Sequence, residues 1–225
     1  MKKVIPNIFT LFNLFFGCLS IIQSKCLECS AWFTIGSLIF DLLDGFTSRF
    51  MKTESKFGKE LDSLADMVSF GIVPSIRIFI LFSSMNENQK IPFIEWSSFL
   101  IPIFSACRLA QFNMDQKQYG LTTPVNALFF TSLSLIKKYT IPSNNIGILI
   151  KDIVFSPITI LFIIFFSCYF LISKIPMLSL NFSGFSCKRN RKRYLFLLIS
   201  IFLLLTLHIV AIPCIIIFYI IISIY

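Results

Sequence analysis

Four aspartates that lie close together in the sequence are the residues most able to do chemistry. Asp41 and Asp44 are three residues apart and Asp62 and Asp66 are four apart, so on helices each pair shares one face. Carboxylates held this close repel one another unless cations lie between them, and ligation by oxygen alone favours Mg²⁺ or Mn²⁺ over zinc. Two such ions neutralise a diphosphate and help to polarise an attacking oxygen. The spacing therefore predicts a metal site for phosphoryl-type transfer.

Two glycines and an arginine between the aspartates fit the same chemistry. Gly45 directly follows one aspartate and Gly58 precedes the second pair, and the missing Cβ at each lets a nucleotide or diphosphate approach the backbone. Arg49 can donate paired hydrogen bonds to phosphate oxygens. Intramembrane carboxylates also serve channels and cation transporters, which is the alternative from a different class. Because a transporter leaves the glycines and the arginine without an evident task, we favour the metal-phosphate site.

The elements that must position these residues are membrane-spanning helices. Of the 225 residues, 56% are hydrophobic and only 14% are charged, whereas soluble domains carry about 25% charge. Several apolar stretches approach the roughly 20 residues that cross a bilayer. We therefore predict an all-α, polytopic membrane helical bundle of about eight spans. The predicted spans are residues 4–23, 31–50, 60–84, 93–113, 122–140, 149–172, 193–207 and 209–224, with the last apolar stretch divided near Ile212-Pro213.

The basic residues predict how the bundle is oriented. With the N-terminus in the cytoplasm, thirteen Lys and Arg fall inside and five outside, as the positive-inside rule requires. This places the loop between the second and third spans on the cytoplasmic face, where nucleotides are available. The net charge of +9 is accordingly interpreted as a topology signal that meets anionic lipid headgroups, with the basic run at 188–193 as an anchor. Nucleic acid is not an expected partner.

The aspartate segment resembles the signature of the CDP-alcohol phosphatidyltransferase family, D-x2-D-G-x2-A-R-x8-G-x3-D-x3-D. Every spacing matches between Asp41 and Asp66. The single departure is Ser48, where the family usually has alanine, and serine is nearly as small.

Further segments are similar to those of the bacterial integral-membrane phosphatidylserine synthases within this family. They cover roughly residues 5–176, and the last fifty residues match only as hydrophobic helices. We therefore predict a six-helix family core over residues 1–176, and a basic loop with two additional spans over residues 177–225. The similar segments are 5–10 with Asn13, 69–74, 107–113 with Gln111 in place of an arginine, 120–124 with Thr122 in place of a proline, and 173–176.

The resemblance implies that CDP-diacylglycerol and L-serine react to give phosphatidylserine and CMP. It implies that Asp41, Asp44 and Asp62 are the principal ligands of two Mg²⁺ or Mn²⁺ ions. Asp66 would touch one metal and act as general base, because a hydroxyl is a poor nucleophile at neutral pH. A homodimer in the bacterial inner membrane, with its active site facing the cytoplasm, is also implied. The residues expected to contact the CDP or diphosphate are Asn7, Thr10, Gly45, Ser48, Arg49 and Gly58.

The carboxylate of serine needs a cationic partner, and Arg108 is predicted to supply it from the cytoplasmic end of the fourth span. Snorkelling to headgroups or pairing with Asp115 is the alternative for Arg108, and snorkelling is the preferred interpretation for Arg77 near the outer end of the third span. The nearest alternative function keeps the chemistry and changes the acceptor to glycerol 3-phosphate or inositol phosphate. Such acceptors would require more basic residues inside the cavity.

Two other reactive residue types are assigned no catalytic task. The single histidine, His208, lies in an apolar stretch far from the aspartates, so a histidine-based mechanism is not expected. Cys26 and Cys29 form a C-x-x-C without a second pair or histidines, which indicates loop cysteines rather than a zinc site.

Overall fold

The computed structural model describes residues 4–52, 55–85, 91–115, 119–139, 152–177 and 191–224. Within these ranges the chain is largely helical and has no strand; seven helices contain 14 residues or more, and Lys56–Ser83 forms a further continuous helical stretch. The all-α class is thereby confirmed. The elements are α1 (Val4–Ile22), α2 (Leu27–Met51), α3 (Lys56–Asp66), the π-helix η1 (Met67–Ile72), α4 (Val73–Ser83), the 3-10 helix η3 (Ile94–Phe99), α5 (Leu100–Asp115), α6 (Thr123–Tyr139), α8 (Pro157–Ile172), α9 (Arg191–Leu207), the 3-10 helix η4 (His208–Val210) and α10 (Ala211–Ile224).

The helices have the length and composition of membrane spans. Four stretches of the described chain are long and apolar enough to cross a bilayer, namely Ile5–Ile22, Leu27–Met51, Lys56–Ser83 and Arg193–Ile224, and Pro157–Ile172 is a shorter apolar helix. The prediction placed the start of this last span at residue 149, whereas α8 begins at Pro157 after the N-cap Ser156, whose side chain accepts the Thr159 N–H. Residues 149–151 lie outside the described ranges.

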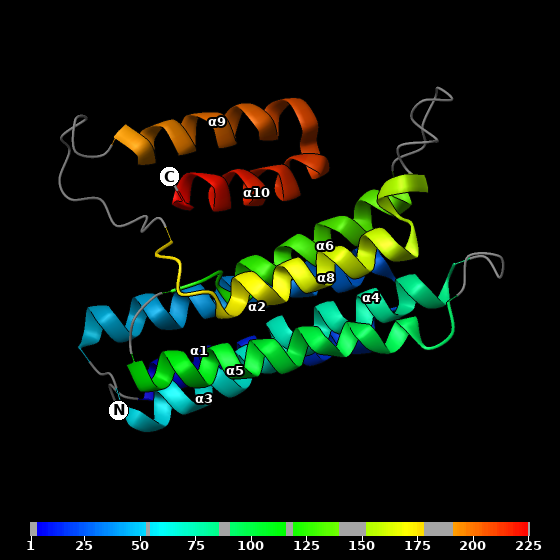
Figure 1. The fold of residues 1–225 in the computed structure, drawn as a ribbon. Helices are drawn as coiled ribbons and strands as arrows, with labels where there is room; N and C mark the ends of the chain where they lie inside the picture. The colour runs from blue at the N-terminus through cyan, green and yellow to red at the C-terminus, as the bar shows by residue number, and fades with distance from the viewer. Residues whose placement is uncertain are drawn as a thin grey trace.

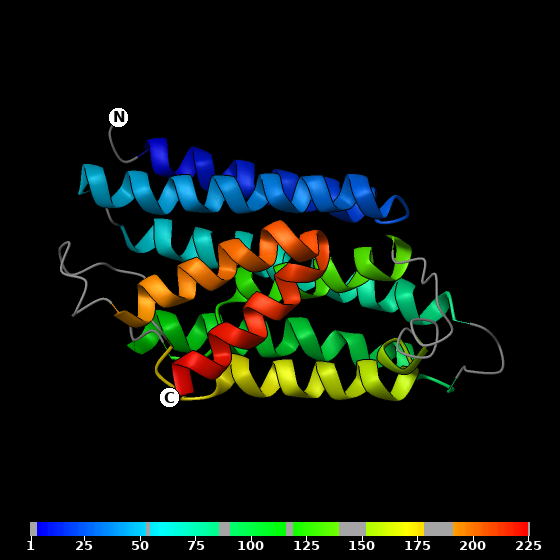
Figure 2. The same cartoon turned by 90° about the horizontal axis from the view of Figure 1, so that it is seen from above.

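The helices lie side by side along one axis, and α9 with α10 forms an antiparallel hairpin on one side of them (Figures 1 and 2). The hairpin contacts the remainder of the bundle chiefly through α6. Its turn is η4, where His208 has a φ of 48°. The predicted division of this stretch into two helices is confirmed, but the break lies at His208–Val210 rather than near Pro213, which lies in the first turn of α10. His208 is exposed there, as expected for a residue outside the chemistry.

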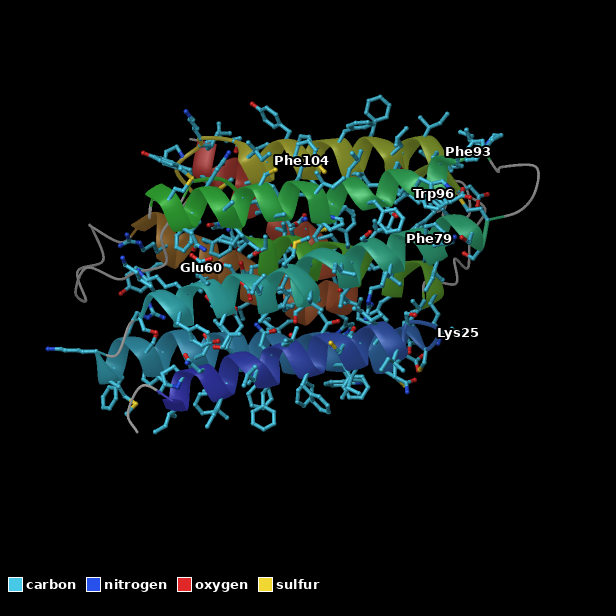
Figure 3. The ribbon with its side chains drawn as sticks, turned by 90° about the horizontal axis from the view of Figure 1, so that it is seen from below. Lys25, Glu60, Phe79, Phe93, Trp96 and Phe104 are labelled. Carbon is cyan, nitrogen blue, oxygen red and sulfur yellow. The ribbon has the colours of Figure 1, made fainter. Side chains whose placement is uncertain are left out.

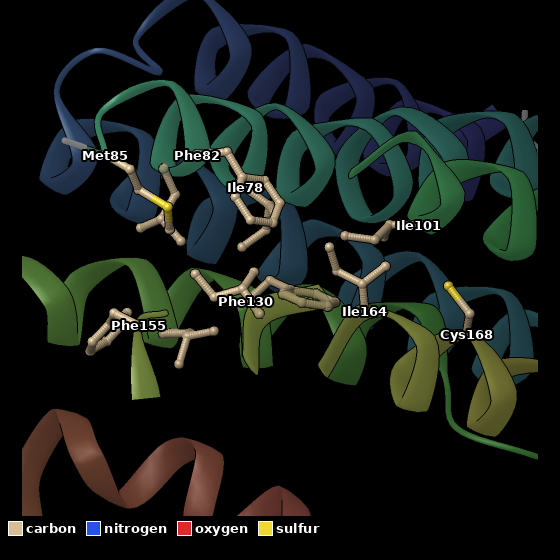
Figure 4. Packing of buried hydrophobic residues seen from close by; sticks show 11 residues of the cluster. Ile78, Phe82, Met85, Ile101, Phe130, Phe155, Ile164 and Cys168 are labelled. Carbon is tan, nitrogen blue, oxygen red and sulfur yellow. The ribbon is translucent and has the colours of Figure 1, made fainter. Parts of the chain in front are cut away.

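One apolar cluster packs α4, α5, α6 and α8 against one another (Figure 4). Ile78, Ile101, Phe130 and Ile164 are fully buried within it. Since lipid chains are as apolar as these side chains, close van der Waals packing rather than exclusion of water stabilises such an interface in a membrane. This cluster fixes the position of α4, which directly follows η1, and of α5, which carries Arg108.

The α1–α2 pair is joined by hydroxyl groups instead. The Ser20 Oγ lies 2.8 Å from the Ser30 Oγ and 2.9 Å from the Thr34 Oγ1. Small polar side chains allow two membrane helices to approach closely and to exchange hydrogen bonds. The pair is therefore a fixed hairpin that brings the end of α2, with its two aspartates, beside the start of α1.

The two ends of the bundle differ in chemistry. Lys25, Phe79, Phe93 and Trp96 lie at one end and Glu60 lies toward the other (Figure 3). The Phe79 and Trp96 rings are 6.1 Å apart between centroids in an edge-to-face arrangement. Clustered aromatic rings are typical of a membrane–water interface. The end near Glu60 carries the aspartates.

Arg77 does not snorkel, so that prediction is wrong. Its side chain is only 1% exposed, and its Nη2 donates to the Ser30 Oγ at 2.8 Å. Among the described residues, its Nε and Nη1 have no hydrogen-bond partner. Small hydroxyl side chains on α1 and α2 leave room for the guanidinium to turn inward, which the position of Arg77 along its span alone did not indicate.

We expect Arg77→Met to increase the free energy of unfolding by about 1–3 kcal/mol, because it removes buried donors that lack partners. Thermal unfolding in detergent measures this effect, and Lys25→Met, at an exposed position of the same end, is the control that should change little. A lower stability of Arg77→Met would contradict the expectation and would indicate that the guanidinium is compensated.

Candidate active site

A cavity of about 550 Å³ opens where α2 ends and α3 begins. The structure brings every residue predicted for the site to this one cavity, from four different helices. Sequence reasoning missed several others that also line it, including Lys59 and Asn113. The predicted residues that line it are Asn7 and Thr10 of α1, Asp41, Asp44, Gly45, Ser48 and Arg49 of α2, Gly58, Asp62 and Asp66 of α3, and Arg108 of α5.

Three of the four aspartates form a tight cluster. Asp41, Asp62 and Asp66 each offer a carboxylate oxygen, and these oxygens lie within 4.8 Å of one another. Asp44 lines the same cavity but is not part of this cluster. The hairpin therefore brings all four carboxylates together as predicted, arranged as a group of three with a fourth beside it.

The cluster fits divalent cations. The buried Asp44 Oδ2 and Asp62 Oδ1 have no hydrogen-bond partner among the described residues, and buried polar atoms are normally satisfied. All-oxygen ligation of this kind suits Mg²⁺ or Mn²⁺.

Asp66 is held by a residue that sequence reasoning did not place in the site. The Asn13 Nδ2 donates to the Asp66 Oδ1 at 3.1 Å, and Asn13 is fully buried. Ser37 donates in turn to the Asn13 Oδ1 and, at 2.9 Å, to its backbone carbonyl. The only sequence signal for Asn13 was its place in a segment similar to the first helix of the family. Asn13 thus orients one oxygen of Asp66 and leaves the other for the cavity.

The backbone beyond Asp66 is a π-helix, which places this residue at a junction in the span. The Val73 N–H donates to the Val68 carbonyl, five residues earlier. Pro74 has no N–H and its ring disfavours the carbonyl four residues before it, so a wider turn suits this segment. Short π-helical segments occur often at functional sites. Residues 69–74, the segment that resembles the phosphatidylserine synthases, therefore include the change from π-helix to α-helix.

Close approach of neighbouring helices holds this junction in place. A Cβ on Gly17 would lie 2.2 Å from the Ser69 Oγ, so only glycine lets α1 approach η1 this closely. The Ser69 Oγ donates to the Asn13 carbonyl at 3.1 Å. Asp66 is therefore positioned by packing on its C-terminal side as well as by Asn13.

The two glycines of the signature differ in their surroundings. A Cβ on Gly45 would meet only the Arg49 Nη2, at 3.8 Å, so this position is open toward the cavity. A Cβ on Gly58 would lie 3.0 Å from the Ser55 Oγ and 3.2 Å from the Asn7 Oδ1. The surroundings of Gly45 fit the predicted space for a ligand. At Gly58 the missing Cβ instead lets α1 and α3 approach each other at the cavity wall.

Two predicted ligand-binding side chains make bonds to their own helices. The Arg49 Nε donates to the Gly45 carbonyl at 2.8 Å, and the Thr10 Oγ1 donates to the Pro6 carbonyl at 3.2 Å. Arg49 is exposed at the cavity mouth, so its guanidinium can turn toward an anion there. Thr10 is 3% exposed and contributes to the wall.

A second cavity of about 200 Å³ adjoins the first, and Arg108 lines both. Two regions that lie far apart in the sequence line it, residues 108–112 with Tyr119 and residues 171–174. Gly120 N–H donates to the Ile175 carbonyl at 3.0 Å and Leu121 N–H to the Phe170 carbonyl at 2.9 Å. The φ of Gly120 is 68°, and a Cβ there would lie within 2.9 Å of three carbonyl oxygens. The loop after α8 is thereby fixed beside Arg108 and brings Lys174 to the cavity wall.

The fold and this site define a class: a polytopic membrane protein with a cluster of carboxylates, able to bind metal, at one end of its bundle. The family model described as CDP-alcohol phosphatidyltransferase matches residues 3–224. The chain belongs to the CDP-alcohol phosphatidyltransferase family.

Curated relatives give the resemblance finer detail. The chain is 40% identical over 112 residues to the CDP-diacylglycerol–serine O-phosphatidyltransferase of Helicobacter pylori (strain J99), across 49% of this chain and 46% of that protein. It is 37% identical over 110 residues to the enzyme of that name from Methanocaldococcus jannaschii, across 48% of this chain and 51% of the relative. The archaetidylserine synthase of Methanothermobacter thermautotrophicus is 30% identical over 149 residues, or 60% of each chain. The chain spans about half the length of the first two of these relatives.

Proposed function

We propose that this protein is a phosphatidylserine synthase, which transfers the phosphatidyl group of CDP-diacylglycerol to the hydroxyl of L-serine and releases CMP. The observation that carries the proposal is the cluster of Asp41, Asp62 and Asp66 carboxylates in the cavity of a protein of this family. Two relatives whose names specify serine as the acceptor support the choice of substrate.

The four aspartates are the proposed metal ligands. Asp41, Asp44, Asp62 and Asp66 would hold two Mg²⁺ or Mn²⁺ ions. Bound divalent ions supply charge neutralisation of the diphosphate and polarisation of the attacking oxygen. Asp66 is in addition the proposed general base, which takes the proton of the serine hydroxyl as that oxygen attacks the lipid-side phosphorus.

The wall formed by α1, α2 and α3 is the proposed site for the CDP moiety. Arg49 would donate to diphosphate oxygens from the cavity mouth. Gly45 leaves its side of the wall open, as its surroundings show. The remaining proposed contacts are Asn7, Thr10, Ser48 and Gly58, which line the same cavity.

The second cavity is the proposed site for serine. Arg108 is 8% exposed and lines both cavities, so a carboxylate bound to it would lie beside the aspartates. Lys174 adds a second cation, so the acceptor side is more basic than the sequence indicated. Two cations also suit an acceptor that carries a phosphate, which makes glycerol 3-phosphate the comparison that any assay must include.

The deciding assay uses purified protein, CDP-diacylglycerol, Mg²⁺ or Mn²⁺, and radiolabelled serine, glycerol 3-phosphate or inositol phosphate in separate reactions. We expect labelled phosphatidylserine and equimolar CMP from serine alone. Labelled phosphatidylglycerophosphate or phosphatidylinositol phosphate would leave the transfer chemistry intact and overturn the acceptor. Absence of any labelled lipid with all three acceptors would overturn the proposed function.

We expect Arg108→Gln to increase the KM for serine about 10- to 100-fold, because a charge-assisted hydrogen bond contributes about 1.5–3 kcal/mol. The KM for CDP-diacylglycerol should stay near that of the unsubstituted chain. Initial rates over a range of serine concentrations measure the effect, with Lys25→Gln at the opposite end of the bundle as the control. An equal increase in both KM values would contradict a specific role in serine binding.

The setting of the enzyme is proposed as well. The distribution of basic residues supports an aspartate cavity that faces the cytoplasm, and the family resemblance supports a bacterial inner membrane. A homodimer follows from the family resemblance. Residues 1–176 as the family core and 177–225 as an added segment remain our division of the chain.

A further inference from the structure

Two cysteines lie in contact at the end of the bundle opposite the aspartate cavity. The Cys26 and Cys29 Sγ atoms are 2.6 Å apart. Cys26 is the N-cap of α2, and its sulfur accepts the Cys29 backbone N–H at 3.4 Å. They follow Lys25, which lies at the end of the bundle remote from Glu60 (Figure 3). The start of α2 thus holds the Cys26 sulfur beside Cys29.

The surroundings of the pair favour thiol chemistry. A helix N-terminus stabilises negative charge and lowers thiol pKa values. The hydrogen bonds of Cys26 with the thiol and the backbone N–H of Cys29 lower the pKa of Cys26. Cys29 is exposed and Cys26 is partly exposed, so a reagent can reach both. The same contact with the Cys26 side chain raises the pKa of Cys29, so Cys26 is the better nucleophile and Cys29 is the adjacent second thiol.

Neighbouring contacts fix the first turn of α2. Glu28, between the two cysteines, accepts from the Lys138 Nζ at 2.7 Å and from the Tyr139 hydroxyl. These bonds join the start of α2 to the end of α6. Because a disulfide has sulfur atoms about 2.05 Å apart, closure of the pair requires a shift of only about half an ångström.

We propose that Cys26 and Cys29 are a modification site that forms a reversible intramolecular disulfide by exchange with a disulfide co-reactant. The Cys26 thiolate attacks one sulfur of the co-reactant, forms a mixed disulfide and releases one thiol. The Cys29 thiolate then attacks the Cys26 sulfur and releases the second thiol. The cysteine pair loses two electrons and two protons, and the co-reactant gains both as two thiols. The orientation proposed above places the pair outside the cytoplasm, where disulfides persist.

The test counts free thiols in the full-length protein in detergent. The protein is equilibrated with either dithiothreitol or glutathione disulfide, denatured, and alkylated with a maleimide. The chain has seven cysteines, so we expect seven adducts after reduction and a loss of two after oxidation, with peptide mapping assigning the loss to Cys26 and Cys29. Dithiothreitol should restore both adducts.

The variant Cys29→Ser and the thiol of Cys107 test whether the disulfide is specific to this pair. In Cys29→Ser, glutathione disulfide should leave a glutathione adduct on Cys26, because the second thiol is missing. Cys107, an exposed free thiol on α5, reports the reactivity of an ordinary cysteine. Alkylation of Cys26 and Cys29 as complete as that of Cys107 after oxidation would overturn the proposal, as would a disulfide mapped to other cysteines. Since the count requires no lipid substrate, its outcome is independent of the proposed transferase activity.

Discussion

Asp66→Asn is expected to lower kcat for phosphatidylserine formation about a hundred- to ten-thousandfold, the usual contribution of a general base. Asparagine keeps the size of the side chain and can still contact Asn13, but it cannot take a proton from the serine hydroxyl. Asp66 also lies in the carboxylate cluster, so the loss of one ligand charge acts in the same direction. The measurement is the initial rate of labelled phosphatidylserine formation at saturating serine and Mn²⁺.

The matched control is Asp152→Asn, an exposed aspartate outside the cavity. It makes the same chemical change and should keep the activity of the unsubstituted chain. Thermal unfolding of both variants separates a catalytic effect from misfolding. An Asp66→Asn protein that folds and retains more than about a tenth of the activity would contradict the role of base.

A substitution of Asn13 tests the role of Asp66 with a smaller expected loss of activity. Asn13→Ala removes the donor to Asp66 without removing the carboxylate, and we expect kcat to fall about tenfold, as the loss of one hydrogen bond to a charged group implies. Because Asn13 is a positioning residue, the KM for serine should change little. A change confined to KM would show that Asn13 acts on the acceptor instead.

The local parts of this site were predictable from the sequence because helical geometry relates neighbouring residues. Spacings of three and four residues placed each aspartate pair on one face of a helix, and the α2–α3 hairpin then brought the pairs together. The separation of Asp44 from the other three was not predictable, because it depends on side-chain directions within the cavity. The all-α class and the approximate positions of the helices followed from hydropathy in the same local way.

The parts that sequence reasoning missed are long-range contacts. Asn13 and Asp66 are 53 residues apart, and nothing in either segment alone indicates that they meet. Lys174 reaches the second cavity because Gly120 and Leu121 donate to the Ile175 and Phe170 carbonyls, which lie on either side of the end of α8. Arg77 lies inside the bundle because small hydroxyl residues on neighbouring helices leave space for it. Each of these depends on packing between helices, which single-segment patterns do not contain.

Binding of a divalent cation to the aspartate cluster should change the thermal stability of the protein as well as its activity. Without divalent cations, the Asp41, Asp62 and Asp66 carboxylates repel one another within 4.8 Å. Asp41→Asn removes one of these charges, so in excess EDTA this variant should unfold at a higher temperature than the unsubstituted chain. A ligand that binds only the folded state stabilises it by about 2.7 kcal/mol at one hundred times its Kd.

Addition of Mn²⁺ should therefore reverse the order of stability. The unsubstituted chain should gain stability and recover its activity after EDTA treatment, whereas Asp41→Asn should gain little of either, because one ligand is missing. Asp152→Asn, which changes the same charge away from the cavity, should follow the unsubstituted chain under both conditions. Only a shared cation site makes the removal of one carboxylate stabilising without metal and destabilising with it. Equal Mn²⁺ responses of Asp41→Asn and Asp152→Asn would show that the cluster does not bind the ion.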